Sequence, residues 1–280
     1  MAEFPRTEIE NLSVSRLIMG VNWWLGFSHT SQAKDRQILE WATRERLAGI
    51  METFLRAGVD TILGIRPDPK FEAAMKDAED RVGRPLVRIG TPTLNIADGQ
   101  AALDETARIL DEYAAIGTRV CMPHSQTTDA LLDRTTRTIR RMDAYCAMIR
   151  QRGMIPGLST HMPESVVYAD ETGLDVAAYI QIYNAVGFLM QLEVDWVHKI
   201  IWGAKHPVIA IKPMGVNRLC PLAGLAFAWA TLRDQDMVCV GTMTADEAKE
   251  LIEISLALLE RRAPGVQLQR TRSKASVEKR

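Results

Sequence analysis

The sequence predicts an α/β fold of one architecture, a single (β/α)8 TIM barrel. Eight short apolar runs rich in β-branched residues alternate along the chain with eight longer segments in which apolar residues recur every three or four positions. The 280 residues also match the roughly 250 in which eight such units close into one barrel. An open doubly wound sheet is the alternative, but no G-x-G-x-x-G motif follows the first apolar run.

Each predicted strand precedes a predicted helix. We expect the strands at 17–21, 59–63, 86–90, 119–122, 155–159, 178–182, 208–211 and 237–240. We expect the helices near 36–56, 68–81, 98–115, 129–151, 163–171, 189–204, 221–232 and 244–261. Several helices end at glycine, as at Ala57-Gly58 and Ile116-Gly117. Residues 1–263 therefore form the barrel, and the basic tail at 264–280 is expected to be loosely held.

Composition excludes several classes of partner. Lys and Arg number 34 against 35 Asp and Glu, which leaves no excess positive charge for nucleic acid or an acidic membrane surface. The four cysteines lack the short spacing of a zinc site or a disulfide framework. The first ten residues lack the basic and apolar segments of a signal peptide. The apolar run 222–232 is too short to cross a bilayer, so we expect this run to form a buried helix. These features indicate a cytoplasmic protein that binds a small molecule, in an oligomeric state that stays open.

Active sites of TIM barrels lie at the carboxyl ends of the strands, so the polar residues expected there are the candidates. Asp60 lies in the second predicted strand, His124 and His161 follow the fourth and fifth, and Lys212 ends the seventh. Two histidines on adjacent strands with an acid nearby favour chemistry over packing. Lys212 either pairs with Asp60 or, if unpaired in an apolar surrounding, has a lowered pKa and is nucleophilic.

The loop after the first predicted strand is aromatic. Trp23, Trp24 and Phe27 lie in it, and rings of this size provide a large contact area at little cost in entropy. We expect these three residues to form an aromatic wall over the substrate, and His29 of the same loop to help the two tryptophans bind it. A cap over the barrel core is the alternative role.

These residues, in this order, resemble the aldo-keto reductase superfamily from Val14 to the last helix. The segment Ala57-Gly-Val-Asp60-Thr61 is similar to the family's A-G-[IV]-x-x-[FW]-D-T, which carries the catalytic aspartate, and His124 falls where the family has its catalytic histidine. Gly157-Leu-Ser159 resembles the motif G-[VI]-S-N. The segment 181–184 resembles Q-x-x-Y-N, the segment 210–215 resembles A-Y-S-P-L-G, and 240–242 resembles the phosphate-side strand eight.

The resemblance implies an oxidoreductase that acts on a small carbonyl or hydroxyl compound with a nicotinamide cofactor, NAD or NADP. The residues implied to hold that cofactor are Ser159, Gln181, Tyr183, Asn184, Arg218, Gly241 and Thr242. The active site diverges from the family pattern, because the family's tyrosine acid has no counterpart at 62–66 and its lysine is replaced around Gly90. In this interpretation His124, His161 or Lys212 takes over the role of the acid.

Two further interpretations stay open. In one, Asp60, His124 and His161 bind a divalent metal ion for a lyase, isomerase or hydrolase reaction, or Lys212 forms a Schiff base for the same classes of reaction. In the other, the barrel binds a ligand without catalysis. An enzyme is expected, and an oxidoreductase is favoured over the other classes.

Overall fold

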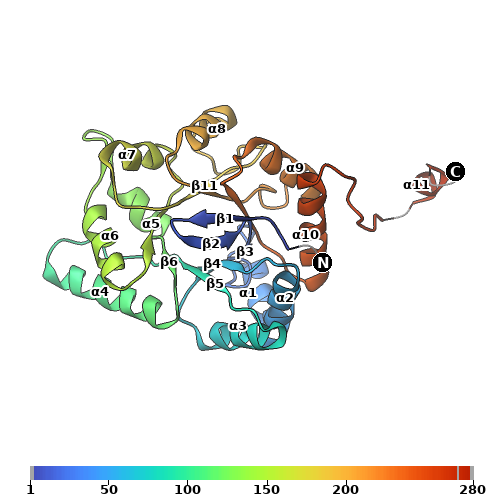
Figure 1. Cartoon of the computed structure of the whole chain (residues 1–280), viewed down its shortest axis with the longest axis horizontal. Coiled ribbons are helices and arrows are strands. Elements are labelled where there is room, and N and C mark those ends of the chain that lie inside the picture. The colour runs from blue at the N-terminus through green and yellow to red at the C-terminus, as the bar shows by residue number, and fades with distance from the viewer. Residues whose placement is uncertain (1–2, 270, 278–280) are drawn as a thin grey trace.

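Strand segments of a single parallel sheet close into a barrel in the computed structural model, which describes residues 3–269 and 271–277 (Figure 1). The order in the sheet is β10-β11-β12-β13-β3-β4-β5-β6-β9. Its two ends meet because β9 (Ile155–Pro156) and β10 (Leu158–Ser159) are halves of one strand. The others are β3 (Leu17–Gly20), β4 (Thr61–Ile65), β5 (Val87–Gly90), β6 (Val120–Cys121), β11 (Tyr179–Ile182), β12 (Val208–Ile211) and β13 (Met237–Val240). The predicted α/β TIM barrel is confirmed.

Helices surround the barrel and connect its strands. They include α3 (Pro69–Val82), α4 (Gln100–Ala115), α7 (Glu164–Thr172), α8 (Val194–Gly203), α9 (Pro221–Thr231) and α10 (Ala245–Leu259). The helix predicted near 36–56 is two helices, α1 (Gln32–Trp41) and α2 (Arg44–Arg56), because the Thr43 hydroxyl accepts a hydrogen bond from the Arg46 N–H and starts the second.

The helix predicted near 129–151 forms only as α6 (Met142–Gln151). Its first half instead folds as the 3-10 helix η1 (Asp129–Leu131) and a small hairpin of β7 (Leu132–Asp133) and β8 (Thr138–Ile139), and the short helix α5 (Ser125–Thr128) comes just before it. Asp133 causes the break, since its carboxylate accepts hydrogen bonds from the backbone N–H groups of Thr135 and Thr136 and so fixes a turn.

An antiparallel hairpin that sequence patterns did not predict covers the amino end of the barrel. It consists of β1 (Arg6–Ile9) and β2 (Leu12–Ser15), and Figure 1 shows it across the centre of the ring of strands. Ile9 and Val14 from the hairpin are fully buried in the same apolar cluster as Ile18 and Ile209 of the strands. The hairpin therefore forms the floor of the barrel.

The core has two layers, one on each side of the strands. Side chains such as Ile89, Ile180 and Met237 fill the barrel interior. Their neighbours along the strands point outward and pack against the helices, as Tyr179 and Val238 do. This alternation decides which strand residues can reach a ligand inside the barrel.

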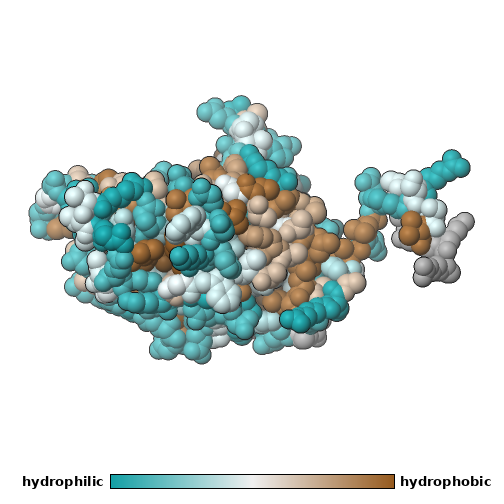
Figure 2. Space-filling view, turned by 90° about the horizontal axis from the view of Figure 1, so that it is seen from above, coloured by the Kyte–Doolittle hydropathy of each residue, from teal (hydrophilic) through white to brown (hydrophobic). Residues whose placement is uncertain are grey.

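Helix α9 was expected to be buried, and only one side of it is. Leu225, Ala228 and Trp229 face the barrel, whereas Leu222 is 47% exposed. Figure 2 shows apolar residues on the face of the molecule that carries α8 and α9. None of the described helices is both long and apolar enough for a membrane span. The tail forms a short helix, α11 (Arg272–Val277), that stands apart from the barrel in Figure 1.

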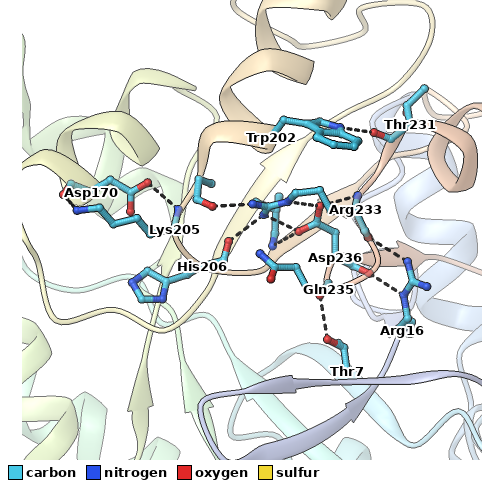
Figure 3. A network of polar contacts seen from close by, with 12 residues as sticks. Thr7, Arg16, Asp170, Trp202, Lys205, His206, Thr231, Arg233, Gln235 and Asp236 are labelled. Carbon is cyan, nitrogen blue, oxygen red and sulfur yellow. Dashed lines mark hydrogen bonds and ion pairs between the residues drawn. The ribbon is translucent and has the colours of Figure 1, made fainter.

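Charged groups at the amino end of the barrel are paired with one another (Figure 3). Asp236, which precedes β13 and is 0% exposed, accepts hydrogen bonds from the backbone N–H of Val208 and from the backbone and guanidinium of Arg233. Arg16 donates to the backbone oxygens of Asp236 and Arg233. The result is a closed polar network that joins strands β3, β12 and β13 at their starts.

Candidate active site

A cavity of about 510 Å³ opens at the carboxyl ends of the strands. It lies above the apolar interior and below the loops that follow β3, β4, β5, β6, β10, β12 and β13. Eight residues that the sequence singled out line it: Trp23, Phe27, His29, His124, Ser159, His161, Lys212 and Gly241. Gly241 gives room to the aromatic loop, since a Cβ there would lie 2.8 Å from Cδ1 of Trp23.

Lys212 is the charged group at the end of β12. Its backbone has a φ of 59°, a left-handed conformation that is uncommon for a residue with a side chain. Its ammonium makes no ion pair within the described part of the chain, and the Asp60–Lys212 pair that was one expectation does not form. Burial lowers the pKa of Lys212 to about 8. A substantial fraction of the amine is therefore neutral near physiological pH.

His124 follows β6 and begins α5. Its Nδ1 accepts a hydrogen bond from the Gln126 backbone N–H at 3.2 Å, so the neutral ring carries its proton on Nε2. Burial, and then the charge of Lys212, lower the pKa of His124. The ring is held in one tautomer, with an N–H that can donate.

His161 follows β10 and lies near the other basic groups. Burial, followed by the charges of Lys212, His124 and His29 in that order, lowers its pKa to about 4. Asp129 of η1 positions the segment, because its carboxylate accepts hydrogen bonds from the His161 backbone N–H at 3.1 Å and from the Thr160 hydroxyl at 2.5 Å. His161 is thus a neutral base at neutral pH.

His29 completes the group of basic residues on the loop after β3. Burial is the main cause that lowers its pKa, followed by the charge of Lys212, while Asp35 acts in the opposite direction. Its φ of 54° also places it in the left-handed region. Three imidazoles and one amine therefore converge on one cavity.

The expectation that Asp60 belongs to this group is wrong. Asp60 precedes β4 and lies at the opposite, amino end of the barrel, where its carboxylate accepts a 2.8 Å hydrogen bond from Arg6 of the floor hairpin. No three His, Cys, Asp or Glu side chains within the described residues are grouped so that they could hold a metal ion. Asp60 therefore does not lie close to His124 and His161, and these three residues do not form the predicted metal site.

The family motif explains the error over Asp60. Counted without a gap from Ala57, the pattern A-G-[IV]-x-x-[FW]-D-T places its aspartate at Leu63. Leu63 lines the cavity and Asp60 does not. The position that carries the family's catalytic carboxylate is therefore apolar in this chain.

Most of the residues expected to hold a nicotinamide cofactor lie outside the cavity. The Tyr183 hydroxyl is 3.1 Å from Nδ1 of His198 on α8, and its ring packs on Phe227 of α9. Gln181 is fully buried, and neither its amide nitrogen nor its amide oxygen has a hydrogen-bond partner within the described structure. Asn184 binds the backbone of Phe188 at both ends of its amide.

The expected cofactor residues Arg218 and Thr242, which follow strands β12 and β13, also lie outside the cavity. Arg218 stacks its guanidinium on the Phe188 ring at 3.6 Å and donates to the Gly215 oxygen. Thr242 is buried, and its backbone oxygen accepts a hydrogen bond from Nε1 of Trp24. Trp24 itself is a core residue rather than part of the cavity wall. Of the implied cofactor residues, Ser159 and Gly241 line the cavity, and Gln181, Tyr183, Asn184, Arg218 and Thr242 lie outside it.

Two cavity residues escaped the sequence patterns. Arg66 comes directly after β4, and Tyr113 reaches the cavity from α4. The Tyr113 ring passes over Gly90 at the end of β5, where a Cβ would lie 2.5 Å from Cδ1 of the ring. Burial raises the pKa of Tyr113 to about 12, so its phenol keeps its proton. A glycine that ends a predicted strand was the one available signal for this close approach.

Comparisons with known proteins agree with this architecture. No protein-family model and no curated protein sequence matches the chain. A provisionally assigned aldo-keto reductase from Pseudomonas aeruginosa aligns with a TM-score of 0.64 at 14% identity, over 91% of this chain and 94% of that one. Aldose reductase from Giardia lamblia aligns with a TM-score of 0.54 at 13% identity, over 96% of this chain and 90% of that one.

The likeness extends to other barrels. A truncated 3-deoxy-D-arabino-heptulosonate 7-phosphate synthase from Thermotoga maritima aligns with a TM-score of 0.54 at 11% identity, over 92% of each chain. Identities this low describe the fold and leave the chemistry to the residues of the site. The comparisons therefore show a TIM barrel whose fold is similar to that of these aldo-keto reductases.

Proposed function

We propose that this protein is an enzyme that acts on small carbonyl compounds, with Lys212 as the nucleophile. The observation that carries this proposal is a partly buried lysine without a carboxylate partner among the described residues, which lines a cavity together with three histidines. A carbonyl carbon reacts with the neutral amine, and burial lowers the pKa of Lys212 to about 8, which makes that form available. The reaction class is that of a Schiff-base lyase or isomerase.

The residues supply each part of the reaction. Nζ of Lys212 attacks the carbonyl carbon, and the carbonyl oxygen takes up protons and leaves as water, which gives a protonated imine. The Nε2–H of His124 is suited to donate a hydrogen bond to that oxygen as negative charge develops on it, while the attacking amine and water supply the protons. The imine then draws electrons from a neighbouring C–H or C–C bond, and neutral His161 accepts the proton released. The enamine formed in this way takes a proton back at carbon and becomes an imine again, and hydrolysis of that imine releases the product and returns the free lysine.

Borohydride trapping tests the imine directly. Sodium borohydride reduces an imine to a stable secondary amine, so incubation with glycolaldehyde, dihydroxyacetone or pyruvate is expected to add the mass of the carbonyl compound to Lys212. Peptide mass mapping locates the adduct. Lys212→Met should abolish it, while Lys205→Met, at the amino end, should retain it. Equal labelling of many surface lysines would contradict the proposal.

The role of His124 has its own test. We expect His124→Ala to reduce turnover or trapping rate roughly 10²–10³-fold, the usual effect of removing a hydrogen-bond donor to a developing oxyanion. The thermal midpoint should change little, because His124 is above the packed interior. A large drop in the midpoint with the rate retained would make His124 a packing residue.

A nicotinamide-dependent oxidoreductase is the second candidate. It is favoured by the likeness in fold to the aldo-keto reductases and by Ser159 and His124, which line the cavity at the family's positions. Fluorescence titration with NADH and NADPH is the measurement. Tighter binding of NADH is expected, since Asp246 and Glu247 begin α10 where the family would pair a second phosphate. Binding of neither nucleotide would exclude this candidate.

A further inference from the structure

The charge of the cavity lining has one sign. Arg66 and Lys212 line it together with His29, His124 and His161, and no residue of the lining is Asp or Glu. A cavity with cationic and neutral basic groups and without carboxylates raises the local concentration of anions. It also disfavours a cationic ligand.

Arg66 differs from most arginines of the molecule in having no close partner. Its nearest carboxylate oxygen, Oδ2 of Asp68, is 4.0 Å away, and its side chain is 44% exposed. Asp68 is already engaged, because its Oδ1 accepts the backbone N–H groups of Lys70 and Phe71 at the start of α3. By contrast, Arg44 and Arg137 hold their carboxylates at 2.6 Å. The guanidinium of Arg66 is therefore free to bind two oxygens of a ligand.

The topology separates Arg66 from Lys212 across the barrel mouth. Arg66 follows β4 and Lys212 follows β12, and strands β3 and β13 lie between them in the sheet. Trp23 covers the end of β13 at Gly241, between the two cations. A ligand that reaches both must have two polar ends joined by a short carbon skeleton.

We propose that the substrate is a small carbonyl compound with a carboxylate or phosphate group, which Arg66 binds while the carbonyl meets Lys212. This inference rests on the proposed function for the carbonyl end only. The anionic end depends on Arg66 and the acid-free lining. A bound anion would also offset the cost of keeping the ammonium of Lys212 in a partly desolvated site.

Binding of simple anions tests the anionic end without any reaction. Isothermal titration with oxalate and with inorganic phosphate is expected to give saturable binding to the intact protein, and Arg66→Gln should weaken it at least tenfold. Arg56→Gln is the matched control, because Arg56 lies on the outer helix α2 and pairs with Glu52 four positions away. The anion that binds more tightly identifies the class of group. No binding of either anion, or equal losses in both variants, would overturn the proposal.

Trapping with matched pairs tests the two ends together. Pyruvate is compared with methyl pyruvate, and dihydroxyacetone phosphate with dihydroxyacetone, so that each pair differs in the anionic group. We expect at least tenfold faster borohydride trapping of one anionic member than of its neutral partner, and Arg66→Gln should remove that difference. Equal trapping of neutral and anionic members would overturn the anionic substrate and leave the imine chemistry intact. Anion binding without any trapping at Lys212 would instead overturn the proposed function alone.

Discussion

At the amino end of the barrel, the Asp236 carboxylate accepts hydrogen bonds from Val208 and Arg233, whereas at the carboxyl end the ammonium of Lys212 has no carboxylate partner within the described residues. Asp236 is fully buried and Lys212 is partly buried. A buried charge with partners holds strands together, and a desolvated charge without partners lowers stability. The difference teaches that the charges at the amino end stabilise the barrel, whereas the charge at the carboxyl end has a cost in stability that the proposed reaction would explain.

Asp236→Ala should destabilise the protein by disrupting the polar network at the amino end of the barrel. Removal of the carboxylate leaves the Arg233 guanidinium and the Val208 N–H unpaired, so we expect the free energy of unfolding to fall by about 3–5 kcal/mol. Urea unfolding at pH 7 measures the loss. Asp234→Ala is the control, because its carboxylate is exposed and 3.9 Å from Arg16, and its loss should cost less than about 0.5 kcal/mol. A similar small loss in both variants would show that the network does not stabilise the barrel.

Lys212→Met should stabilise the protein, whereas Asp236→Ala is expected to destabilise it. Burial lowers the pKa of Lys212 from 10.5 to about 8, which corresponds to a cost of roughly 3 kcal/mol below pH 8. Removal of the amine should therefore raise the free energy of unfolding at pH 7 by up to about 3 kcal/mol. Lys249→Met, on an exposed face of α10, should have little effect.

The pH dependence of the free energy of unfolding, compared between the native protein and Lys212→Met, tests this prediction further. Between pH 8 and 10.5 the unfolded chain keeps the proton of Lys212 and the folded protein has lost it, so the stability of the native sequence should rise with pH through this window. The stability curve of Lys212→Met should lack that rise. A variant less stable than the native protein at pH 7 would mean that Lys212 has a partner.

His161 should titrate far below an ordinary histidine. Because its pKa is lowered to about 4, the folded protein resists the proton that the unfolded chain binds at pH 6.5, and stability should fall as the pH decreases from 6.5 to 4. Proton NMR of the five histidines measures the midpoint, and the spectrum of His161→Gln assigns the signal. A midpoint near 6.5 would place the ring in water rather than in the cavity.

Asp60→Asn should have the smallest effect. Loss of the ion pair with Arg6 removes one partly exposed contact between the floor hairpin and β4, so we expect a cost of about 1 kcal/mol. Trapping at Lys212 should be unchanged, because Asp60 lies at the other end of the barrel. A drop of tenfold or more in the trapping rate of a stable variant would show that Asp60 contributes to the reaction at Lys212.

The fold followed from the sequence because periodicity reports which side chains are buried, but the ends of strands are less well defined. The second strand was expected at 59–63 and forms at 61–65. At about 3.3 Å per residue, this shift of two positions moves a side chain by roughly 7 Å along a strand of five residues. That distance was enough to exchange Asp60 for Leu63 and Arg66 at the cavity.

The direction of side chains on β11 could not be predicted either. All four residues of this strand are buried, since one face packs in the barrel and the other against helices. Apolar periodicity therefore does not separate the inward Ile180 from the outward Gln181 and Tyr183. His124, His161 and Lys212 were predictable as cavity residues, because each directly follows an apolar run whose end the sequence marks with a polar residue or proline.

The floor hairpin closes the amino end of the barrel to the passage of small molecules. With Ile9 and Val14 sealed against the interior side chains, the chamber above them is blind, and substrate, product and water share the mouth at the carboxyl ends. In the proposed reaction, a substrate that enters to meet Lys212 must expel water through the same mouth, and a second molecule cannot enter until the first has left. Products should therefore inhibit competitively, and loops around Trp23 that slow their escape would set the pace of turnover.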